Sequence, residues 1–150
     1  MTLPKSGDET LFVVHEHHAR KLHWDLRLEV PGTKEDIKET CSYSNLNIEI
    51  KEANSVLWSF AVPKAKLPQR GERILAIETE PHPIEYKDFE GEIPEKNYGA
   101  GKVKIYDKGT VKWKEVSEKK LVFELSGKSI TGEFVLVHFK EKNWLWMKKS

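Results

Sequence analysis

Cysteine is nearly absent from this sequence of 150 residues, where Cys41 is the single example. One thiol excludes an internal disulfide and any zinc site built from several cysteines. Strong charge of one sign is also missing, because 25 Lys and Arg nearly balance 24 Asp and Glu, for a net charge of +1. Any binding to nucleic acid must therefore depend on a local patch rather than on general electrostatic attraction.

Long hydrophobic runs are missing as well. No apolar run approaches the length of a membrane span, and the opening residues MTLPKSGDET contain no signal-peptide core. We therefore expect a soluble intracellular protein, cytoplasmic and monomeric, with no membrane partner. What the sequence does contain is 38% hydrophobic residues, with five Trp, six Phe and four Tyr. This composition and length favour a single packed domain over residues 1–150.

Alternation of apolar and polar residues runs through the sequence and is typical of half-buried β-strands. Strands are predicted over residues 11–17, 21–30, 56–63, 73–80, 102–107, 110–116, 120–126, 132–139 and 144–149. Lys108-Gly109 predicts a hairpin turn between two of them. The polar residues 31–55 predict a loop with a short helix and an extra strand. Without a long amphipathic helix, the pattern predicts an all-β fold, a compact closed or nearly closed barrel of short antiparallel strands.

The strand over residues 21–30 is the most informative segment. His23, Asp25 and Arg27 alternate along it, so their side chains project from one face. The opposite face is apolar and consists of Leu22, Trp24, Leu26 and Leu28. An imidazole beside a carboxylate suits a divalent metal ion, and a guanidinium two residues further on suits a phosphate. This strand is therefore predicted to carry a site.

His17, His23 and Asp25 together provide two histidines and one carboxylate. Such a set leaves coordination positions free for water and substrate, as a catalytic metal ion requires. Without a thiolate and with one hard carboxylate, Mn²⁺ is favoured, and Co²⁺, Zn²⁺ or Fe²⁺ are alternatives. His15 shares the strand parity of His17, but we interpret it as a packing residue outside the site.

Other candidate residues lie further along the chain. His82 stands between Pro81 and Pro83, and this stiff segment suits a donor to a phosphate oxygen or a general acid. Tyr86 follows four residues later and supplies a hydroxyl group. Lys64 and Arg73 stand at strand ends, where each alone is most simply a solvated charge.

A row of lysines marks the predicted hairpin at Lys108-Gly109. Lys102, Lys104, Lys112 and Lys114 share one parity, opposite to that of Val103, Ile105, Val111 and Trp113. Their simplest role is solvation of an exposed face. Contact with a nucleic-acid backbone is the alternative.

Several segments, in order, resemble one known family. FVVHEHHARKLHWDLRLE, VLWSFAVPK, EPHPIEYKDFEGEIP, YGAGKVKIYDKG, GKSITGEFVLVHF and WLWMKK are similar to successive blocks of the 3′-phosphoesterase module of bacterial DNA ligase D and its free-standing archaeal relatives. The resemblance covers about residues 11–149. Residues 31–55 interrupt it as an insertion.

The resemblance implies a β-barrel enzyme that acts on the 3′ end of a DNA primer–template and depends on Mn²⁺. In the family, a terminal ribonucleotide is trimmed to leave a 3′-phosphate, which is then removed to leave a 3′-hydroxyl. The implied metal ligands are His17, His23 and Asp25. The implied catalytic and phosphate-binding residues are Arg27, His82, Tyr86, Lys64 and Arg73. We expect this chain to act alone, or in trans with a DNA ligase or polymerase.

Two other classes of function remain open. The His23–Asp25 pair with a distant histidine, His82, is also similar to the metal site of non-haem iron oxygenases. A non-catalytic module that binds nucleic-acid ends and holds a structural metal is the other alternative. Turnover that requires iron and 2-oxoglutarate indicates the first class, and tight end binding without product indicates the second.

Overall fold

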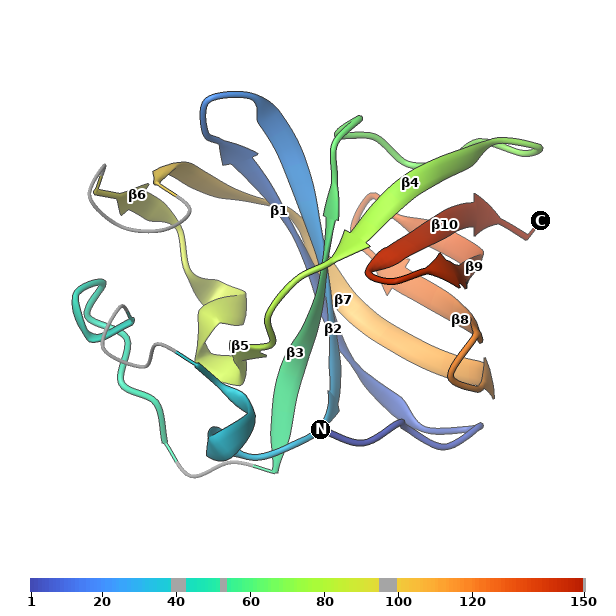
Figure 1. The fold of residues 1–150 in the computed structure, drawn as a ribbon, viewed down its shortest axis with the longest axis horizontal. Helices are drawn as coiled ribbons and strands as arrows, with labels where there is room; N and C mark the ends of the chain where they lie inside the picture. Colours follow the sequence, from blue (N-terminus) through green and yellow to red (C-terminus); the bar gives the residue numbers. More distant parts are fainter. Residues whose placement is uncertain (39–42, 52–53, 95–99, 150) are drawn as a thin grey trace.

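A closed ring of eight antiparallel strands forms the body of the protein in the computed structural model, which describes residues 1–38, 43–51, 54–94 and 100–149 (Figure 1). The strands of the ring are β1 (Glu9–His18), β2 (Leu22–Pro31), β3 (Ser55–Val62), β4 (Arg73–Glu78), β7 (Gly101–Val116), β8 (Lys120–Gly127), β9 (Thr131–Lys140) and β10 (Asn143–Lys148). Their order around the ring is β1-β2-β3-β4-β10-β9-β8-β7, and pairing of β7 with β1 closes it. The predicted all-β barrel is confirmed.

The alternation of the sequence decides which side chains fill the barrel. Trp24, Leu26 and Leu28 of β2 are buried in one hydrophobic cluster, as the pattern predicts. Leu22 is 46% exposed because it lies at the end of β2 beside the turn from β1. The interior is rich in aromatic rings, and its largest fully buried side chains include Trp113 and Trp146. A buried inner face fixes the register of each strand and so decides which residues face outward.

The hairpin predicted at Lys108-Gly109 does not exist. Residues 101–116 form a single strand, β7, which stays extended because β1 pairs with it without interruption across Lys108 and Gly109. A side chain at Gly109 would collide with the carbonyl oxygen of Ser126 on β8. The glycine therefore permits a close approach of two strands instead of a turn.

Two chain segments lie outside the ring, on the same side of it in Figure 1. The first contains η1 (Lys34–Asp36), and the second contains β5 (His82–Pro83), η2 (Ile84–Asp88) and β6 (Gly91–Ile93). β5 pairs with β3, and β6 pairs with β7. Tyr98 and Gly99 of the YGAG sequence lie outside the described residues. No helix in the described part of the chain is long and apolar enough to cross a membrane.

The extra strand expected within residues 31–55 is not formed by the described residues 43–51. The carbonyl of Tyr43 accepts hydrogen bonds from the backbone N–H groups of Leu46 and Ile48, which makes a turn. Asn47 within this turn has a φ of 61°, in the left-handed region. The backbone therefore curls back on itself, and Tyr43 and Ile50 pack against the hydrophobic cluster.

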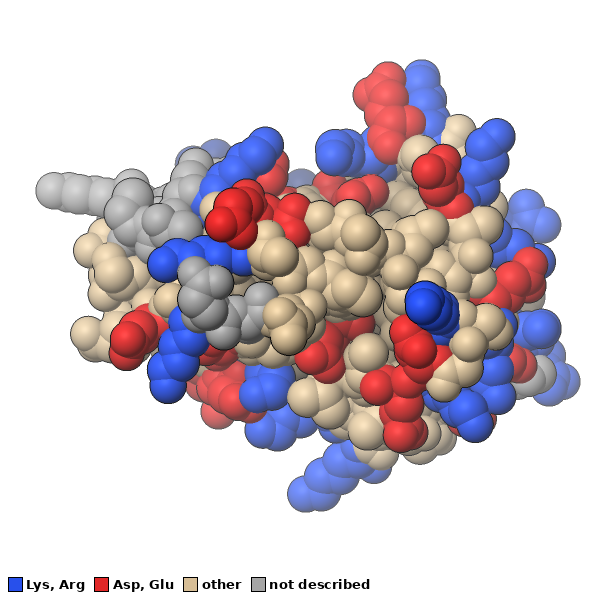
Figure 2. Space-filling model, turned by 90° about the horizontal axis from the view of Figure 1, so that it is seen from below, with Lys and Arg blue, Asp and Glu red and all other residues tan. Residues whose placement is uncertain are grey.

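Charges of both signs are mixed on the surface. Figure 2 shows Lys and Arg side chains interspersed with Asp and Glu around an uncharged area on the face seen from below. This distribution agrees with the net charge of +1. Recognition of a charged ligand must therefore come from a local group of residues.

Candidate metal and phosphate site

The pairing of β1 with β2 places the candidate residues next to one another on the outer face of the barrel. His17 lies directly opposite His23, and His15 lies opposite Asp25. Because Trp24 and Leu26 point into the hydrophobic core, their neighbours His23, Asp25 and Arg27 point outward. The prediction that these three side chains share a face is confirmed by their mutual contacts.

His17, His23 and Asp25 form a compact cluster. One ligand atom from each residue lies within 4.8 Å of the other two. Oδ2 of Asp25 is 3.3 Å from Nε2 of His23 and 3.7 Å from Nδ1 of His17. Two imidazole nitrogens and a carboxylate oxygen at this spacing can hold a divalent transition-metal ion and leave further coordination positions open.

The orientation of His17 is set by a hydrogen bond on its far side. Its Nε2–H donates to the carbonyl oxygen of Ala100 at 3.2 Å. That bond places a proton on Nε2, and Nδ1 faces Oδ2 of Asp25. A backbone carbonyl that orients a histidine in this way is a common second partner of metal ligands.

Asp25 is ionised although it is only 5% exposed. Burial by itself raises the pKa of Asp25, but the charge of Arg27 and the hydrogen bonds of His17 and His23 outweigh it and hold this pKa well below its usual range. The same contact with Asp25 raises the pKa of His23, against the effect of partial burial. The cluster therefore carries the negative charge that a cation requires.

Arg27 is buried, and the protein holds its guanidinium group on several sides. Nε donates to Nδ1 of His15 at 2.9 Å, Nη1 donates to Oγ of Ser59 at 2.9 Å, and Nη2 lies 3.3 Å from Oδ2 of Asp25. Cζ lies 5.0 Å from the ring centre of Tyr86. A guanidinium held in place beside candidate metal ligands suits the binding of phosphate oxygens.

His15 and Ser59 belong to this site, and the sequence interpretation missed both. His15 is fully buried, as a packing residue is, but it also accepts the Arg27 hydrogen bond. Its parity with His17 and its place opposite Asp25 in a short hairpin are signals that could have identified it. Ser59 has no such signal, because only the pairing of β3 with β2 places it opposite Arg27.

His82 reaches the site from β5. Its Nδ1–H donates to the carbonyl oxygen of Glu80 at 2.8 Å, and Oγ of Ser59 lies 3.3 Å from the same nitrogen. Burial and then the positive charge of Arg27 lower the pKa of His82 well below its usual value. His82 is therefore neutral, with its proton on Nδ1 and a lone pair on Nε2. It is not a member of the metal cluster formed by the described residues.

Tyr86 of η2 packs against Arg27. Its ring contacts those of His15 at 5.2 Å and His82 at 5.1 Å, and it stacks on Phe89 at 5.1 Å. Burial raises the pKa of Tyr86, so its hydroxyl group remains protonated at neutral pH. Tyr86 thus links Arg27, His15 and His82 into one packed group.

Tyr43, from the segment 31–55, also contacts the site. Its ring meets those of His82 at 5.8 Å and Tyr86 at 5.7 Å, both edge to face. No sequence signal indicated this contact, because Tyr43 precedes the alternating residues 46–50 of this segment. The segment therefore supplies an aromatic side chain beside the imidazole of His82.

Lys64 and Arg73 lie apart from this group. Lys64 is exposed in the turn after β3, and Arg73 is exposed at the start of β4. Within the described part of the chain, no hydrogen bond or ion pair joins either residue to the metal cluster. Their phosphate-binding roles stay predictions.

The fold and the site together define a small β-barrel protein with a candidate two-histidine, one-carboxylate metal centre and a buried arginine beside it. Comparison with known proteins makes this more specific. The chain belongs to the DNA ligase D 3′-phosphoesterase domain family, because the family model matches residues 39–138. Those residues include His82 and Tyr86, whereas the metal cluster precedes them. Membership of this family supports a hydrolase of the phosphoesterase class that processes 3′ ends.

Curated relatives cover more of the chain. It is 37% identical to the multifunctional non-homologous end joining protein LigD of Mycolicibacterium smegmatis and to LigD of Mycobacterium tuberculosis, each over 95% of this chain. It is 31% identical to LigD of Pseudomonas aeruginosa over 91% of this chain. The aligned part spans only 15–17% of the length of these three relatives.

Proposed function

We propose that this protein is a metal-dependent phosphoesterase that heals the 3′ ends of DNA. It cleaves the last phosphodiester of a strand that ends in a ribonucleotide, which releases the terminal residue as a nucleoside and leaves a 3′-phosphate, and it then hydrolyses that phosphate to a 3′-hydroxyl. The observation that carries the proposal is the contact between the two halves of the site: Nη2 of Arg27 lies 3.3 Å from the Asp25 oxygen that also faces both histidines. The candidate metal ligands and the guanidinium of Arg27 therefore share the carboxylate of Asp25.

The metal ion of this proposal is Mn²⁺, with Co²⁺ or Zn²⁺ as substitutes, held by His17, His23 and Asp25. When bound, such an ion supplies Lewis-acid polarisation of the phosphate and lowers the pKa of a water molecule. The donor set fits it, because Asp25 is ionised and His17 turns Nδ1 toward the Asp25 carboxylate. One carboxylate with two imidazoles suits Mn²⁺ and its neighbours in the first transition series.

Arg27 is assigned to the phosphate. A guanidinium carries five N–H donors, and the contacts with His15, Ser59 and Asp25 use three of them. The remaining two donate to non-bridging oxygens and stabilise the charge that develops in the transition state. Because the group is already held in place, little reorganisation accompanies the reaction.

His82 and Tyr86 complete the reacting group. Nε2 is the free nitrogen of His82, since Nδ1 is held by the carbonyl of Glu80. The negative charge of a bound phosphate offsets the positive charge of Arg27 and so raises the pKa of His82. Nε2 then takes up a proton and donates it to a phosphate oxygen or to the leaving oxygen. The Tyr86 hydroxyl, which stays protonated, is a second donor to the substrate.

The substrate of this proposal is the 3′ end of a DNA primer–template that carries a terminal ribonucleotide or a 3′-phosphate. The 2′-hydroxyl distinguishes a ribonucleotide end from a deoxyribonucleotide end. The product, a 3′-hydroxyl, is the group that a polymerase extends or a ligase joins. These enzymes are the proposed partners in trans, in line with the end-joining proteins to which the chain is similar.

The test uses a 5′-labelled primer–template that ends in one ribonucleotide, incubated with Mn²⁺ or with EDTA. Stepwise conversion to a 3′-phosphate and then to a 3′-hydroxyl, with Mn²⁺ alone, supports both reactions. His138→Ala is the control for histidine variants, because His138 stacks on Trp144 of β10 outside the site. An unchanged primer in both incubations contradicts the proposal, and retained end binding would then indicate a non-catalytic module.

A further inference from the structure

Residues 31–55 form an insertion in the resemblance to the known family, and the proposed reaction uses none of them. Ile37 and Ile50, near the two ends of this segment, pack against the hydrophobic cluster of the barrel. Between them the backbone turns at Tyr43, whose carbonyl accepts two backbone N–H groups. Figure 1 shows residues 43–51 next to η2, on its side away from the ring of strands. The side chain of Tyr43 is therefore held in place beside the site.

Tyr43 extends an aromatic surface that begins with His82 and Tyr86. Its ring centre lies 5.8 Å from that of His82 and 5.7 Å from that of Tyr86, at interplanar angles of 76° and 77°. Tyr86 is only 3% exposed, whereas Tyr43 and His82 are half-buried. The accessible part of this surface thus belongs to Tyr43 and His82. Accessible aromatic rings of this kind suit contact with a nucleobase.

The guanidinium of Arg27 lies between the metal cluster and this aromatic surface. Nη2 is 3.3 Å from Oδ2 of Asp25, which belongs to the cluster. Nη1 donates to Oγ of Ser59, and the same oxygen lies 3.3 Å from Nδ1 of His82. A phosphate bound at Arg27 is therefore flanked by the metal cluster on one side and by His82 on the other.

The direction of the reaction follows from this arrangement. In a phosphoryl transfer the attacking and leaving oxygens lie roughly in line across the phosphorus atom. Water activated at the metal cluster attacks from that side, so the leaving oxygen lies on the side of His82. When a strand ends in a ribonucleotide, the leaving oxygen is the 5′-oxygen of the terminal nucleoside. This nucleoside consequently lies on the side where the ring of Tyr43 contacts His82.

We infer that Tyr43 forms a subsite for the nucleoside that the reaction releases, with its ring packed against the base of that nucleoside. This inference rests on the proposed function, which assigns water to the metal cluster and the leaving oxygen to His82. Every base has a face that can pack on an aromatic ring, so the subsite accepts any base and discriminates against an end without one. Because Tyr43 belongs to the insertion, the subsite is a property of this chain and not of the blocks that it shares with the family.

The experiment compares two 5′-labelled primer–templates that differ only at the 3′ end. One ends in an adenine ribonucleotide and the other in an abasic ribonucleotide, so both keep the 2′-hydroxyl and the leaving 5′-oxygen. A template adenine opposite this position prevents pairing in both. The kcat/KM of cleavage is measured with Mn²⁺, and the Kd is measured by fluorescence anisotropy in EDTA. The wild-type protein favours the adenine end about fivefold in each measurement, the lower end of the range for a base on an aromatic ring.

Variants of Tyr43 separate this subsite from a role in holding His82. Tyr43→Ala brings both ratios close to one. Tyr43→Leu does the same, although it keeps an apolar side chain against the hydrophobic cluster and so guards against a loss of folding in the alanine variant. Tyr43→Phe keeps the ring and both ratios. A ring that only held the His82 imidazole would change the reaction of the two ends equally and leave the ratios unchanged.

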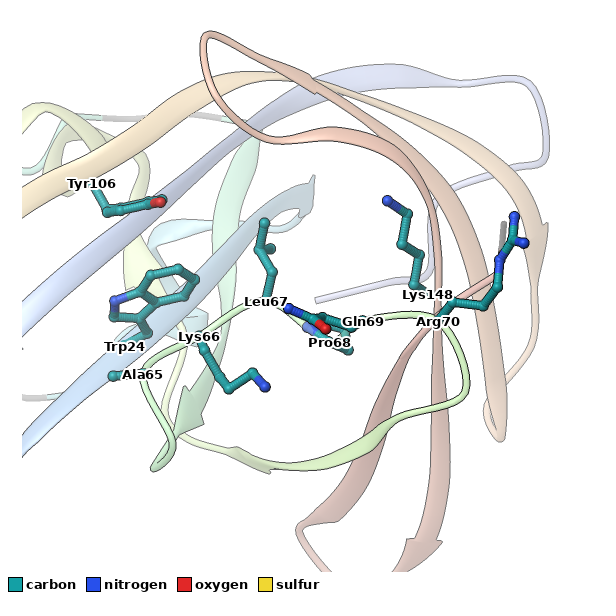
Figure 3. Close-up of a pocket in the computed structure, with 9 residues that line it drawn as sticks. All are labelled: Trp24, Ala65, Lys66, Leu67, Pro68, Gln69, Arg70, Tyr106 and Lys148. Carbon is teal, nitrogen blue, oxygen red and sulfur yellow. The ribbon is translucent and has the colours of Figure 1, made fainter.

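Tyr106→Ala is the matched control, since it removes another accessible tyrosine ring. Tyr106 is 45% exposed, and its ring centre lies 4.4 Å from that of Trp24. Both residues line a pocket of about 700 Å³ on the other side of β2 from the metal cluster, between the β3–β4 connection, β7 and β10 (Figure 3). This variant keeps both ratios at the wild-type value, because its ring is not part of the surface formed by Tyr43 and His82.

The outcomes separate this inference from the proposed function. Wild-type ratios close to one overturn the inference, and so do unchanged ratios in Tyr43→Ala and Tyr43→Leu. Ratios that fall in these two variants, but not in Tyr43→Phe or Tyr106→Ala, support it. If neither end is cleaved while the Kd ratio still falls in these two variants, then the proposed reaction fails and the nucleoside subsite stands.

Discussion

Arg27 and His15 are joined by a buried hydrogen bond of 2.9 Å in which Nε of the arginine donates to Nδ1 of the histidine. The other ring nitrogen of His15, Nε2, donates to the carbonyl oxygen of Phe89 at 3.1 Å. Burial and then the charge of Arg27 lower the pKa of His15 to about 3. His15 is therefore neutral and fixed in one tautomer, and it connects the β1–β2 hairpin to the end of η2.

His15→Ala is expected to reduce turnover at least tenfold without loss of metal binding. The substitution leaves Nε of Arg27 without its acceptor and the carbonyl of Phe89 without its donor, which costs about 3 kcal/mol of stability. His15→Asn places Oδ1 near the former position of Nδ1 and restores part of the turnover. Primer assays and urea unfolding measure the two effects, and wild-type turnover in the alanine variant contradicts a positioning role.

His23→Ala is expected to abolish both the activity and the stabilisation by metal. Mn²⁺ at 100 times its Kd stabilises the wild-type protein by about 2.7 kcal/mol, which raises Tm by roughly 5–10 °C. The variant lacks one of three ligands, so its Tm does not respond to Mn²⁺. Thermal unfolding with Mn²⁺ and with EDTA measures this difference.

His138→Ala is the matched control for His23→Ala, since it removes a histidine outside the site and should respond to Mn²⁺ as the wild-type protein does. Turnover of His23→Ala above a tenth of the wild-type value at equal Mn²⁺ argues against His23 as a ligand. So does a Tm increase in that variant.

Tyr43→Ala is expected to lower turnover several-fold. Its ring holds those of His82 and Tyr86 from the side, and its removal frees the His82 imidazole to change orientation. Tyr43→Phe keeps both ring contacts, so its turnover remains closer to that of the wild-type protein. Steady-state kinetics on the labelled primer distinguish the variants, and equal kcat for the alanine variant and wild type excludes a role of the Tyr43 ring in turnover.

Asp107→Asn is expected to reduce the free energy of unfolding by about 2 kcal/mol at pH 7. Oδ1 of Asp107 accepts the backbone N–H groups of Lys108 and Lys128, and Oδ2 accepts those of Ser129 and Ile130. An asparagine side chain offers one acceptor oxygen in place of two. Urea unfolding followed by tryptophan fluorescence measures the loss.

The effect of Asp107→Asn depends on pH with a defined sign. Burial raises the pKa of Asp107, but the four N–H donors outweigh burial and lower it below the usual value. A depressed folded-state pKa gives stability that is present above the unfolded pKa of about 3.9 and is lost as the pH falls through the folded pKa. The difference in the free energy of unfolding between the variant and the wild-type protein therefore becomes smaller below about pH 4. A gap that widens in acid contradicts this account, and Glu124→Gln, an exposed carboxylate of β8, is the control.

The shared face of His23, Asp25 and Arg27 was predictable from the sequence, because strand periodicity places the three on one side without any knowledge of neighbouring strands. His17 followed from the short turn that brings β1 beside β2. The prediction of a hairpin at Lys108-Gly109 was wrong, since a Lys-Gly pair is compatible with a turn and with an extended strand. Only the unbroken pairing of β1 with Lys108 and Gly109 selects the strand.

The surroundings of the cluster depended on contacts between distant parts of the chain. Ser59 reaches Arg27 through the pairing of β3 with β2, and Ala100 reaches His17 across 83 residues. Tyr43 comes from the segment 31–55, for which the sequence indicated no contact with the site. Residue types and spacing carry no information on such contacts, because they arise when the chain closes on itself.

The sequence by itself determined the all-β class, the alternating strands, the inner and outer faces of β2 and the donor atoms of the cluster. These properties are local, since a side-chain period of two holds for any strand. The tertiary structure decided the partners that orient His17, the contacts that hold Arg27, and the position of the pocket behind β2. Those properties depend on barrel closure, which brings residues far apart in the chain into contact and buries their charges together.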